Sequence, residues 1–292
     1  MKKVRKCVIP VAGMGTRFLP GTKAIPKEMF PIIDKPAIQY NVEEAVKSGI
    51  EEILFITSSY KNSVIDHFDT NYELESRLKE TNKLDKLKIV KDITKLAKFT
   101  YIRQGEPLGS ADAIKLAKNF VGDEPFAVMF GDDVMKYDDV PVLKQLIDIY
   151  EEKDCNVIGI KEVDKKLVYK YGIIEYENEE TGKIKTIIEK PTVEEAPSNH
   201  AGLGRYIVKP EIFDELENLT KGAGNEYQFT DAMKELMKKQ DFYACNIDGK
   251  YFDIGNQLGY IKANVEFALV RDDLKDDVKS YVKNELPTII NK

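Results

Sequence analysis

The sequence of 292 residues has few of the side chains that bind transition metals or form disulfides. It contains two histidines and three cysteines, with neither a Cys-x-x-Cys nor a His-Glu-x-x-His pattern. A zinc site is therefore not expected, and any metal would have to be held by carboxylates. Cys7, Cys155 and Cys245 lie far apart in apolar, strand-like segments. We expect three buried free thiols and no disulfide.

Long apolar runs are also absent. No stretch approaches the ~18 apolar residues that a membrane span needs, and Met1–Lys6 leads into a strand pattern rather than a signal-peptide core. We expect a cytoplasmic protein that does not contact a membrane. The net charge of -6 comes from scattered acidic residues, which argues against a nucleic-acid surface.

A glycine-rich, cationic stretch directly follows the first strand pattern. After Lys6–Pro10, residues 11–28 read Val-Ala-Gly-Met-Gly-Thr-Arg-Phe-Leu-Pro-Gly-Thr-Lys-Ala-Ile-Pro-Lys-Glu. Gly13 and Gly15 permit a tight turn that presents several backbone N–H groups together, which is typical of an anion site. Three cations lie in the same stretch: Arg17, Lys23 and Lys27. These features predict a phosphate cradle for a nucleotide, although an ordinary strand-to-helix turn would carry the same two glycines.

Two common phosphate-binding motifs do not fit this stretch. A dinucleotide fingerprint needs a small residue at position 18, where the chain has Phe18, so NAD is not expected. A P-loop has four residues between its glycines and then Gly-Lys-Ser or Gly-Lys-Thr. Here Gly15 and Gly21 enclose five residues, and Thr22-Lys23-Ala24 follows. This argues against a P-loop ATPase.

Strand and helix patterns alternate along the first half of the chain. Lys6–Pro10 and Ile53–Thr57 have the apolar pattern of buried strands, and Pro36–Ser48 between them has apolar residues at helical spacing. A strand, a helix and a strand in this order form a right-handed parallel unit. The sequence thus predicts an α/β fold of Rossmann-like type, with three layers and a mostly parallel sheet covered by helices on both faces.

We expect one domain over residues 1–271 and a charged, helical tail over 272–292. Within the domain, residues 1–135 and 136–271 form two halves. Residues 61–98 are highly charged, with leucines at helical spacing, and are interpreted as a helical insertion. That insertion could have a function, as a lid or as a subunit contact. The alternative is a solvated helical cover.

Polar side chains follow two of the strand patterns, where an open parallel sheet places its ligand site. Gln104 follows Phe99–Arg103 and is well placed to pair with the edge of a nucleobase, although a surface loop residue would look the same. Asp132 and Asp133 follow the apolar run Phe126–Phe130. Carboxylates there need a compensating cation, unless they only cap the next turn. We take Asp132 as the magnesium ligand.

The glycine-rich stretch resembles the signature of the sugar nucleotidyltransferases, Gly-x-Gly-Thr-Arg followed at some distance by Pro-Lys. The longer run over residues 13–36 is similar to the members of this family that use UTP and glucose 1-phosphate. The resemblance extends from Lys3 to about residue 270 and is strongest before residue 60.

The resemblance implies transfer of a uridylyl group from UTP to glucose 1-phosphate, which gives UDP-glucose and pyrophosphate. The reaction would be a magnesium-assisted, in-line single displacement. Residues 1–135 would bind the nucleotide and residues 136–271 the sugar. No general base is needed, because the attacking phosphate is already ionised at neutral pH. We also expect a homo-oligomer, either a dimer or a tetramer.

The resemblance also assigns roles to individual residues. The catalytic cations are Arg17, Lys27 and Lys190. The nucleotide-binding residues are Ala12, Gly13, Gly15, Thr16, Gln104 and Gly109. The sugar-binding residues are Gly172 and Glu189, to which we add Gly204, a strand glycine that permits close approach of the backbone. The magnesium ligands are Asp132 and Asp253, whose convergence is a structural test. Without the resemblance, Glu189 and Lys190 would be an ordinary surface pair and Asp253 a helix-start residue.

One departure from the family leaves base selectivity open. After the glycine that corresponds to Gly109, the family continues with Leu-Gly-His-Ala, whereas this chain has Ser110-Ala111-Asp112-Ala113. The enzyme could therefore serve another base or sugar 1-phosphate. A nucleotide-sugar-binding regulator with a decayed active site is a further alternative, against which the retained glycine, cationic and aspartate positions argue.

Overall fold

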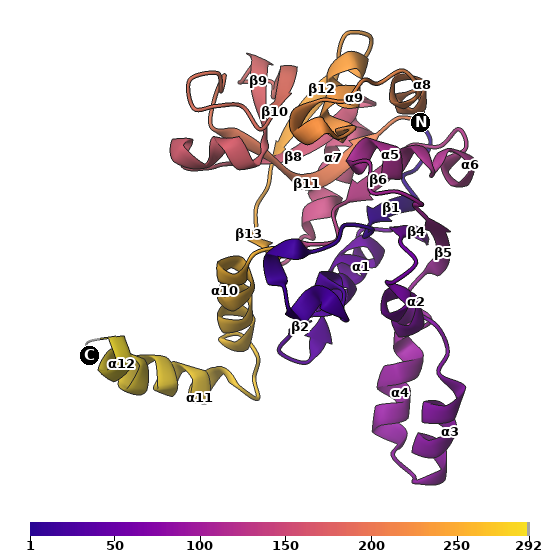
Figure 1. Ribbon diagram of the computed structural model, residues 1–292, viewed down its shortest axis with the longest axis vertical. Coiled ribbons are helices and arrows are strands. Elements are labelled where there is room, and N and C mark those ends of the chain that lie inside the picture. Colours follow the sequence, from indigo (N-terminus) through magenta and orange to yellow (C-terminus); the bar gives the residue numbers. More distant parts are fainter. Residues whose placement is uncertain (291–292) are drawn as a thin grey trace.

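A computed structural model describes residues 1–290 of the chain (Figure 1). Nine strands form one sheet in the order β5-β4-β1-β6-β11-β8-β12-β10-β9. Their bounds, in that order, are Lys98–Arg103, Glu52–Thr57, Lys6–Pro10, Phe126–Met129, His200–Val208, Asn156–Glu162, Phe242–Asn246, Lys183–Glu189 and Gly172–Asn178. The central strands are built from continuous apolar runs because both faces of the sheet are covered.

The sheet is parallel in its first half only. β5, β4, β1 and β6 are parallel neighbours, with Cys7 of β1 aligned with Ile53 of β4 and Ala127 of β6. Beyond β6 the pairs are antiparallel, except for β8 with β12. The prediction of a mostly parallel sheet is therefore wrong for the sheet as a whole. An apolar strand pattern does not record direction, which is set by the connections between strands.

Helices cover both faces of the sheet, which confirms the α/β prediction in its coarse form. On one face lie α1 (Ala37–Lys47), α2 (Asn62–Phe68) and α7 (Val142–Lys153). On the other lie α5 (Ser110–Lys115), α6 (Lys118–Val121), α8 (Ile212–Glu217) and α9 (Phe229–Leu236). Each face has its own apolar core, and all three cysteines are buried and free, as expected.

Two short two-stranded sheets lie beside the main sheet. β7 (Asp133–Lys136) pairs antiparallel with β13 (Lys250–Asp253), and β2 (Pro31–Ile32) pairs with β3 (Lys35–Pro36). In the first pair Asp253 lies opposite Asp133. A third apolar cluster, which includes Val134 and Phe252, packs these small sheets against α10 (Gln257–Ala268). The pairing of β7 with β13 brings distant parts of the chain to the end of β6.

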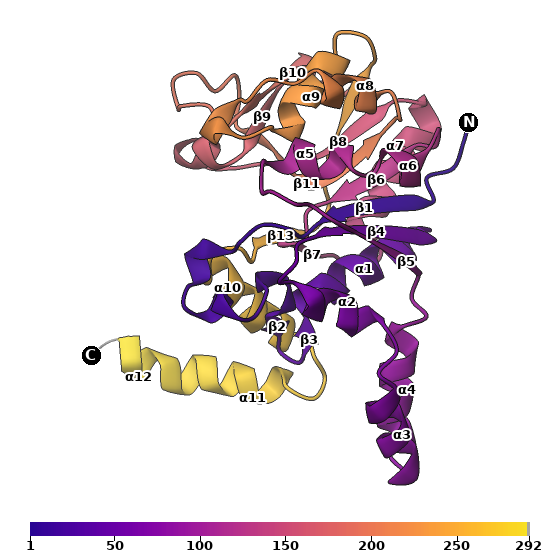
Figure 2. The same ribbon diagram turned by 45° about the vertical axis from the view of Figure 1, so that its right-hand side comes forward.

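Two helical segments extend from the body (Figures 1 and 2). α3 (Tyr72–Glu80) and α4 (Leu84–Ile93) form a hairpin within the charged segment 61–98. The chain ends, as far as the structure describes it, in α11 (Lys275–Ser280), the π-helix η6 (Tyr281–Glu285) and α12 (Leu286–Ile290). Over residues 1–290, no helix has the length and apolar character needed to cross a membrane.

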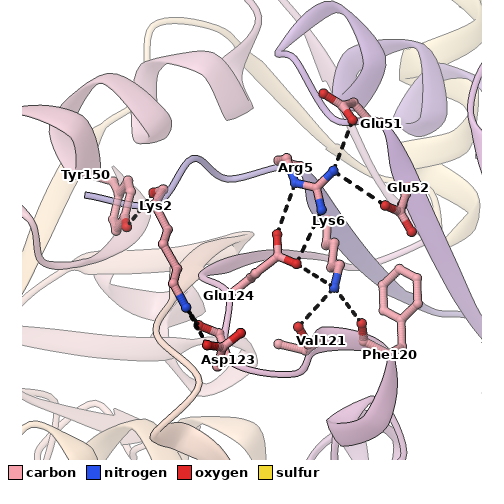
Figure 3. Close-up of polar contacts among 10 residues, drawn as sticks. All are labelled: Lys2, Arg5, Lys6, Glu51, Glu52, Phe120, Val121, Asp123, Glu124 and Tyr150. Atoms are coloured by element: carbon pink, nitrogen blue, oxygen red, sulfur yellow. Dashed lines mark hydrogen bonds and ion pairs between the residues drawn. The ribbon is translucent and has the colours of Figure 1, made fainter.

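A polar cluster joins the amino ends of β1 and β4 (Figure 3). Glu124 accepts from Arg5 Nε at 3.0 Å and lies 2.8 Å from Lys6 Nζ. Arg5 also pairs with Glu51 at 3.2 Å, and Lys6 donates to the carbonyl oxygen of Phe120 at 2.9 Å. Ion pairs at or near the surface stabilise by only about 0–1 kcal/mol each. The cluster therefore lies at the amino ends of these strands. A ligand site of an open parallel sheet is expected at the opposite end, beyond the carboxyl ends of the strands.

Candidate active site

Two neighbouring cavities lie beyond the carboxyl ends of β1 and β6. The larger has a volume of about 640 Å³ and the smaller about 230 Å³. Eight of the sequence-predicted residues line the larger cavity: Arg17, Lys27, Asp132, Gly172, Glu189, Lys190, Gly204 and Asp253. Six line the smaller cavity: Ala12, Gly13, Lys27, Gln104, Gly109 and Asp132. Lys27 and Asp132 belong to both sets, so they lie where the cavities meet. Gly15 and Thr16 line neither cavity.

The glycine-rich stretch folds into three short 3-10 turns, η1 (Thr16–Phe18), η2 (Gly21–Lys23) and η3 (Lys27–Met29). Gly15 precedes the first turn with φ +65°, a left-handed conformation that favours glycine. Gly13 has no positive φ, and an added Cβ there would meet no atom within 4 Å. The tight-turn explanation therefore holds for Gly15 and is wrong for Gly13, where the missing side chain leaves space. Lys23 is exposed and lines neither cavity.

The two predicted magnesium ligands converge. A Cβ built on Gly255 would lie 2.6 Å from Asp132 Oδ2, 2.9 Å from Asp253 Oδ1 and 3.0 Å from a guanidinium nitrogen of Arg17. These three side chains therefore surround one point, and only glycine leaves it free. The backbone N–H of Ile254 donates to the carbonyl oxygen of Asp132 at 3.0 Å, which holds the two segments together.

Each of these carboxylates has a cationic partner. Lys27 Nζ lies 2.5 Å from Asp132 Oδ2, and Arg17 Nη1 lies 3.5 Å from Asp253 Oδ2. Burial opposes the charged form of Asp132, yet the neighbouring Lys27 ammonium holds the pKa of this carboxyl below its usual value. Burial likewise opposes the charge on Lys27, and its carboxylate neighbours, Asp132 and Glu28, hold its pKa above the usual value. At the junction of the cavities, each carboxylate thus lies beside a cationic side chain.

Asp133, for which the sequence predicts no metal-ligand role, is buried in the wall of the larger cavity. Burial and the adjacent Asp132 carboxylate raise the pKa of Asp133 to about 7, and Tyr251 donates its hydroxyl proton to Asp133 Oδ1 at 2.8 Å. Gly204 has φ +57°, and a Cβ there would lie 2.9 Å from Asp133 Cγ. Glycine at 204 therefore makes room for the Asp133 carboxylate as well as lining the cavity.

Glu189 and Lys190 lie at the end of β10 on the far side of the larger cavity. Thr230 donates its hydroxyl proton to Glu189 Oε2 at 2.9 Å, and a Cβ on Gly172 would lie 3.2 Å from the same oxygen. Lys190 has φ +46°, which is uncommon for a residue with a side chain, and its ammonium is about half exposed at 3.3 Å from Glu189. Strain of this kind costs about 1–3 kcal/mol and often marks a functional position.

A buried network, missed by sequence reasoning, holds the turn that carries Asp132. We call Asn41, Glu44 and Arg205 the Arg205 network. Arg205 is 0% exposed and binds both oxygens of Glu44, at 3.1 and 2.9 Å. It also donates to Asn41 Oδ1 at 2.8 Å and to the carbonyl oxygen of Asp133 at 2.9 Å. Asn41 in turn donates to the carbonyl oxygen of Gly131 at 3.0 Å. An arginine inside the apolar strand β11 was the available signal, since a buried charge needs partners.

Residues 6–268 match the family model described as Nucleotidyl transferase. The chain belongs to the nucleotidyl transferase family. The resemblance drawn from the glycine-rich stretch is thereby confirmed, and the cavities of this nucleotidyl transferase lie within the matched residues.

Named relatives are similar to this protein over nearly the whole chain. A UTP–glucose-1-phosphate uridylyltransferase of Staphylococcus epidermidis is 47% identical over 285 residues, which cover 97% of this chain and 99% of that protein. A solved UDP-glucose pyrophosphorylase complexed with UDP-glucose has a TM-score of 0.84 and 43% identity, and covers 92% of this chain and 100% of its own. A solved UTP-bound enzyme of the same name from Acinetobacter baumannii has a TM-score of 0.87 and 36% identity. The match covers 97% of this chain and 99% of that one.

Proposed function

We propose that this nucleotidyl transferase joins UTP and glucose 1-phosphate to give UDP-glucose and pyrophosphate. The observation that carries the proposal is the meeting of Asp132, Asp253, Lys27 and Arg17 where the two cavities join. The names of relatives at 47% and 43% identity support the same reaction. A nucleotide in the smaller cavity and a sugar phosphate in the larger one would place their phosphates at this junction.

The chemistry follows from charge placement. An oxygen of glucose 1-phosphate attacks the α-phosphorus of UTP, the new P–O bond forms, and pyrophosphate leaves in line with its bonding electron pair. Both reactants are anions that repel each other, so the protein must hold them together. Lys190 is proposed to bind the sugar phosphate, and Arg17 and Lys27 the departing pyrophosphate. The attacking oxygen needs no general base, and both histidines of the chain lie outside the lining of the two cavities.

Asp132 and Asp253 are proposed to hold Mg²⁺. Their converging carboxylates are hard oxygen donors, and Mg²⁺ usually takes one or two carboxylates together with substrate phosphates. Within residues 1–290, no group of three or more His, Cys, Asp or Glu side chains is placed to hold a metal ion. When bound, the ion would supply positive charge that screens the phosphates.

The remaining assignments concern recognition. We assign Ala12, Gly13, Gln104 and Gly109 to uridine binding, because they line the smaller cavity. We assign Gly172, Glu189 and Gly204 to the sugar, because they line the larger one. Gly15 and Thr16 would shape the loop from outside both cavities.

The proposed division of the chain follows these two sets of residues. Residues 1–135 are proposed as the nucleotide-binding half and residues 136–271 as the sugar-binding half of one Rossmann-like, three-layer domain. Residues 61–98 are proposed as a helical insertion and residues 272–292 as a helical tail, of which residues 291–292 lie outside the described part of the chain. The expected dimer or tetramer stays a prediction, which size-exclusion chromatography with light scattering would test.

The substrate assignment is tested with a panel of nucleoside triphosphates and sugar 1-phosphates, with pyrophosphate release as the readout. We expect the highest kcat/KM for UTP with glucose 1-phosphate. A higher value for dTTP or for galactose 1-phosphate would reassign the substrate within the same enzyme class. Binding of UDP-glucose without pyrophosphorolysis would indicate the regulator instead.

The site assignment is tested with Asp132→Ala and Asp253→Ala at saturating Mg²⁺. We expect kcat to fall by orders of magnitude while the circular dichroism spectrum stays unchanged. Asp85→Ala, an exposed acid in the first turn of α4, is the control. Lys190→Ala should mainly raise KM for glucose 1-phosphate. Rates for Asp132→Ala equal to those of the wild type would remove that residue from the site.

A further inference from the structure

The side-chain amide of Gln104 is held in one orientation. Gln104 lies just after β5, is 7% exposed, and lines the smaller cavity. Its Nε2 donates to Asp112 Oδ2 at 2.7 Å and to the carbonyl oxygen of Gly109 at 3.3 Å. Both N–H groups of the amide are therefore used by groups of the protein. Within residues 1–290, no donor is found for Gln104 Oε1, which leaves an acceptor for a ligand.

The hydrogen-bond partners of the Gln104 amide determine which of its two ends is the nitrogen and which is the oxygen. A backbone carbonyl and an ionised carboxylate only accept hydrogen bonds, so turning the amide by 180° would place its oxygen against two other oxygens. The carboxylate of Asp112 is the stronger of the two restraints, because its contact is shorter and charge-assisted. Among the described residues, Asp112 has no Lys or Arg partner within 4 Å, so Gln104 is its principal contact. Asp112 also stands where the family has histidine, at the departure that left base selectivity open.

We propose that Asp112 is a specificity-determining, positioning residue that selects the base through Gln104. The inference rests on the proposed function, in which the smaller cavity takes the nucleobase. With Asp112 in place, Gln104 presents only an acceptor to the base. Where this acceptor faces ring position 3, uracil offers an N3–H that pairs with it, whereas cytosine has an unprotonated N3 whose lone pair repels it. The donor of cytosine, its 4-amino group, lies at the neighbouring position of the ring edge. Uracil is thus preferred to cytosine by a group that does not touch the base.

A structural role for Asp112 makes a different prediction. Asp112 lies in the first turn of α5, where a carboxylate is favourable for any helix. Loss of that contribution would lower the stability of the protein and the use of every nucleotide equally. A change in the ratio of kcat/KM values for UTP and CTP would come only from the orientation of Gln104.

The test compares wild type, Asp112→Asn and Asp112→Ala, with Asp85→Asn as the matched control in the first turn of α4. Asparagine has nearly the same shape as aspartate and can donate or accept, so the Gln104 amide is free to turn. We expect the ratio of kcat/KM for UTP to that for CTP to fall by roughly tenfold or more in both Asp112 variants, since one hydrogen-bond orientation is lost. The control should keep the wild-type ratio.

Binding of UDP and CDP to the same proteins, measured by calorimetry, gives a second readout that needs no catalysis. A loss of base discrimination in Asp112→Asn by binding would support the inference even if the reaction were reassigned. A ratio that stays within twofold of wild type in both Asp112 variants, while both triphosphates lose activity together, would overturn it. Failure of the wild type to use UTP would instead refute the proposed function, and the binding arm would then decide the role of Asp112 alone.

Discussion

Replacing Arg205 with methionine tests whether the Arg205 network holds the turn that carries Asp132. The substitution removes a side chain that is 0% exposed and leaves the Glu44 carboxylate, 1% exposed, without its cation. Among residues 1–290, only the backbone N–H of Leu143, at 3.0 Å, would still donate to that carboxylate. An uncompensated buried charge of this kind costs about 3–5 kcal/mol. That is a large part of the ~5–15 kcal/mol by which proteins are usually stable.

Adding Glu44→Leu to Arg205→Met removes both charges. Apolar residues of similar volume often replace a buried ion pair at little cost, so the double variant should regain most of the lost free energy of unfolding. Turnover should not return. Arg205 also donates to the carbonyl oxygens of Asp133 and Gly204, and no apolar side chain replaces those contacts. A displacement of about 1 Å at a catalytic group can cost on the order of 100-fold in rate.

The assay is a double-mutant cycle with four proteins: wild type, Arg205→Met, Glu44→Leu and the double variant. The free energy of unfolding in urea and the rate of pyrophosphate release are measured for each of them. We expect a coupling free energy of at least ~2 kcal/mol in stability and a kcat/KM that stays low in the double variant. Full recovery of both quantities would refute a positioning role, because the network would then only fill space. A loss below ~1 kcal/mol in Arg205→Met would refute the assignment of an uncompensated charge.

Three further predictions concern glycines and thiols. Gly255→Ala should abolish most turnover without unfolding the protein, because its Cβ would enter the point shared by the two aspartates, whereas Gly105→Ala, with no atom within 4 Å of its Cβ, should be tolerated. Gly109→Ala should lower the melting temperature, because φ at this position is +123° and the added Cβ would lie 2.7 Å from the backbone nitrogen of Tyr227. Backbone strain of this kind costs about 1–3 kcal/mol or more. An unchanged melting curve would contradict this prediction. Burial raises the pKa of Cys245 to about 12, and all three cysteines are buried. Ellman's reagent at pH 8 should therefore label the chain only after denaturation. Rapid labelling of the native protein would show an accessible thiolate and contradict this prediction.

Sequence reasoning found the parts of the candidate site that follow directly from strand ends. Asp132 comes after the fully apolar strand β6, and Gln104 comes after β5, so both were expected at the carboxyl edge of the sheet. Gly13 was found for the wrong reason, since only Gly15 needs a left-handed backbone. Arg205 was visible as a charge in an apolar strand, but its partner Glu44 lies in a helix far away in sequence.

The sequence by itself determined the α/β class, the buried free thiols and the run of local motifs, because these depend on the periodicity and chemistry of neighbouring residues. Only the tertiary structure decided which strands run antiparallel, that Asp253 reaches Asp132 through the pairing of β13 with β7, and that Asp112 fixes the Gln104 amide. Those contacts join residues whose separation along the chain carries no record of their distance in space. They form because buried polar groups must find partners wherever the packed layers bring them together.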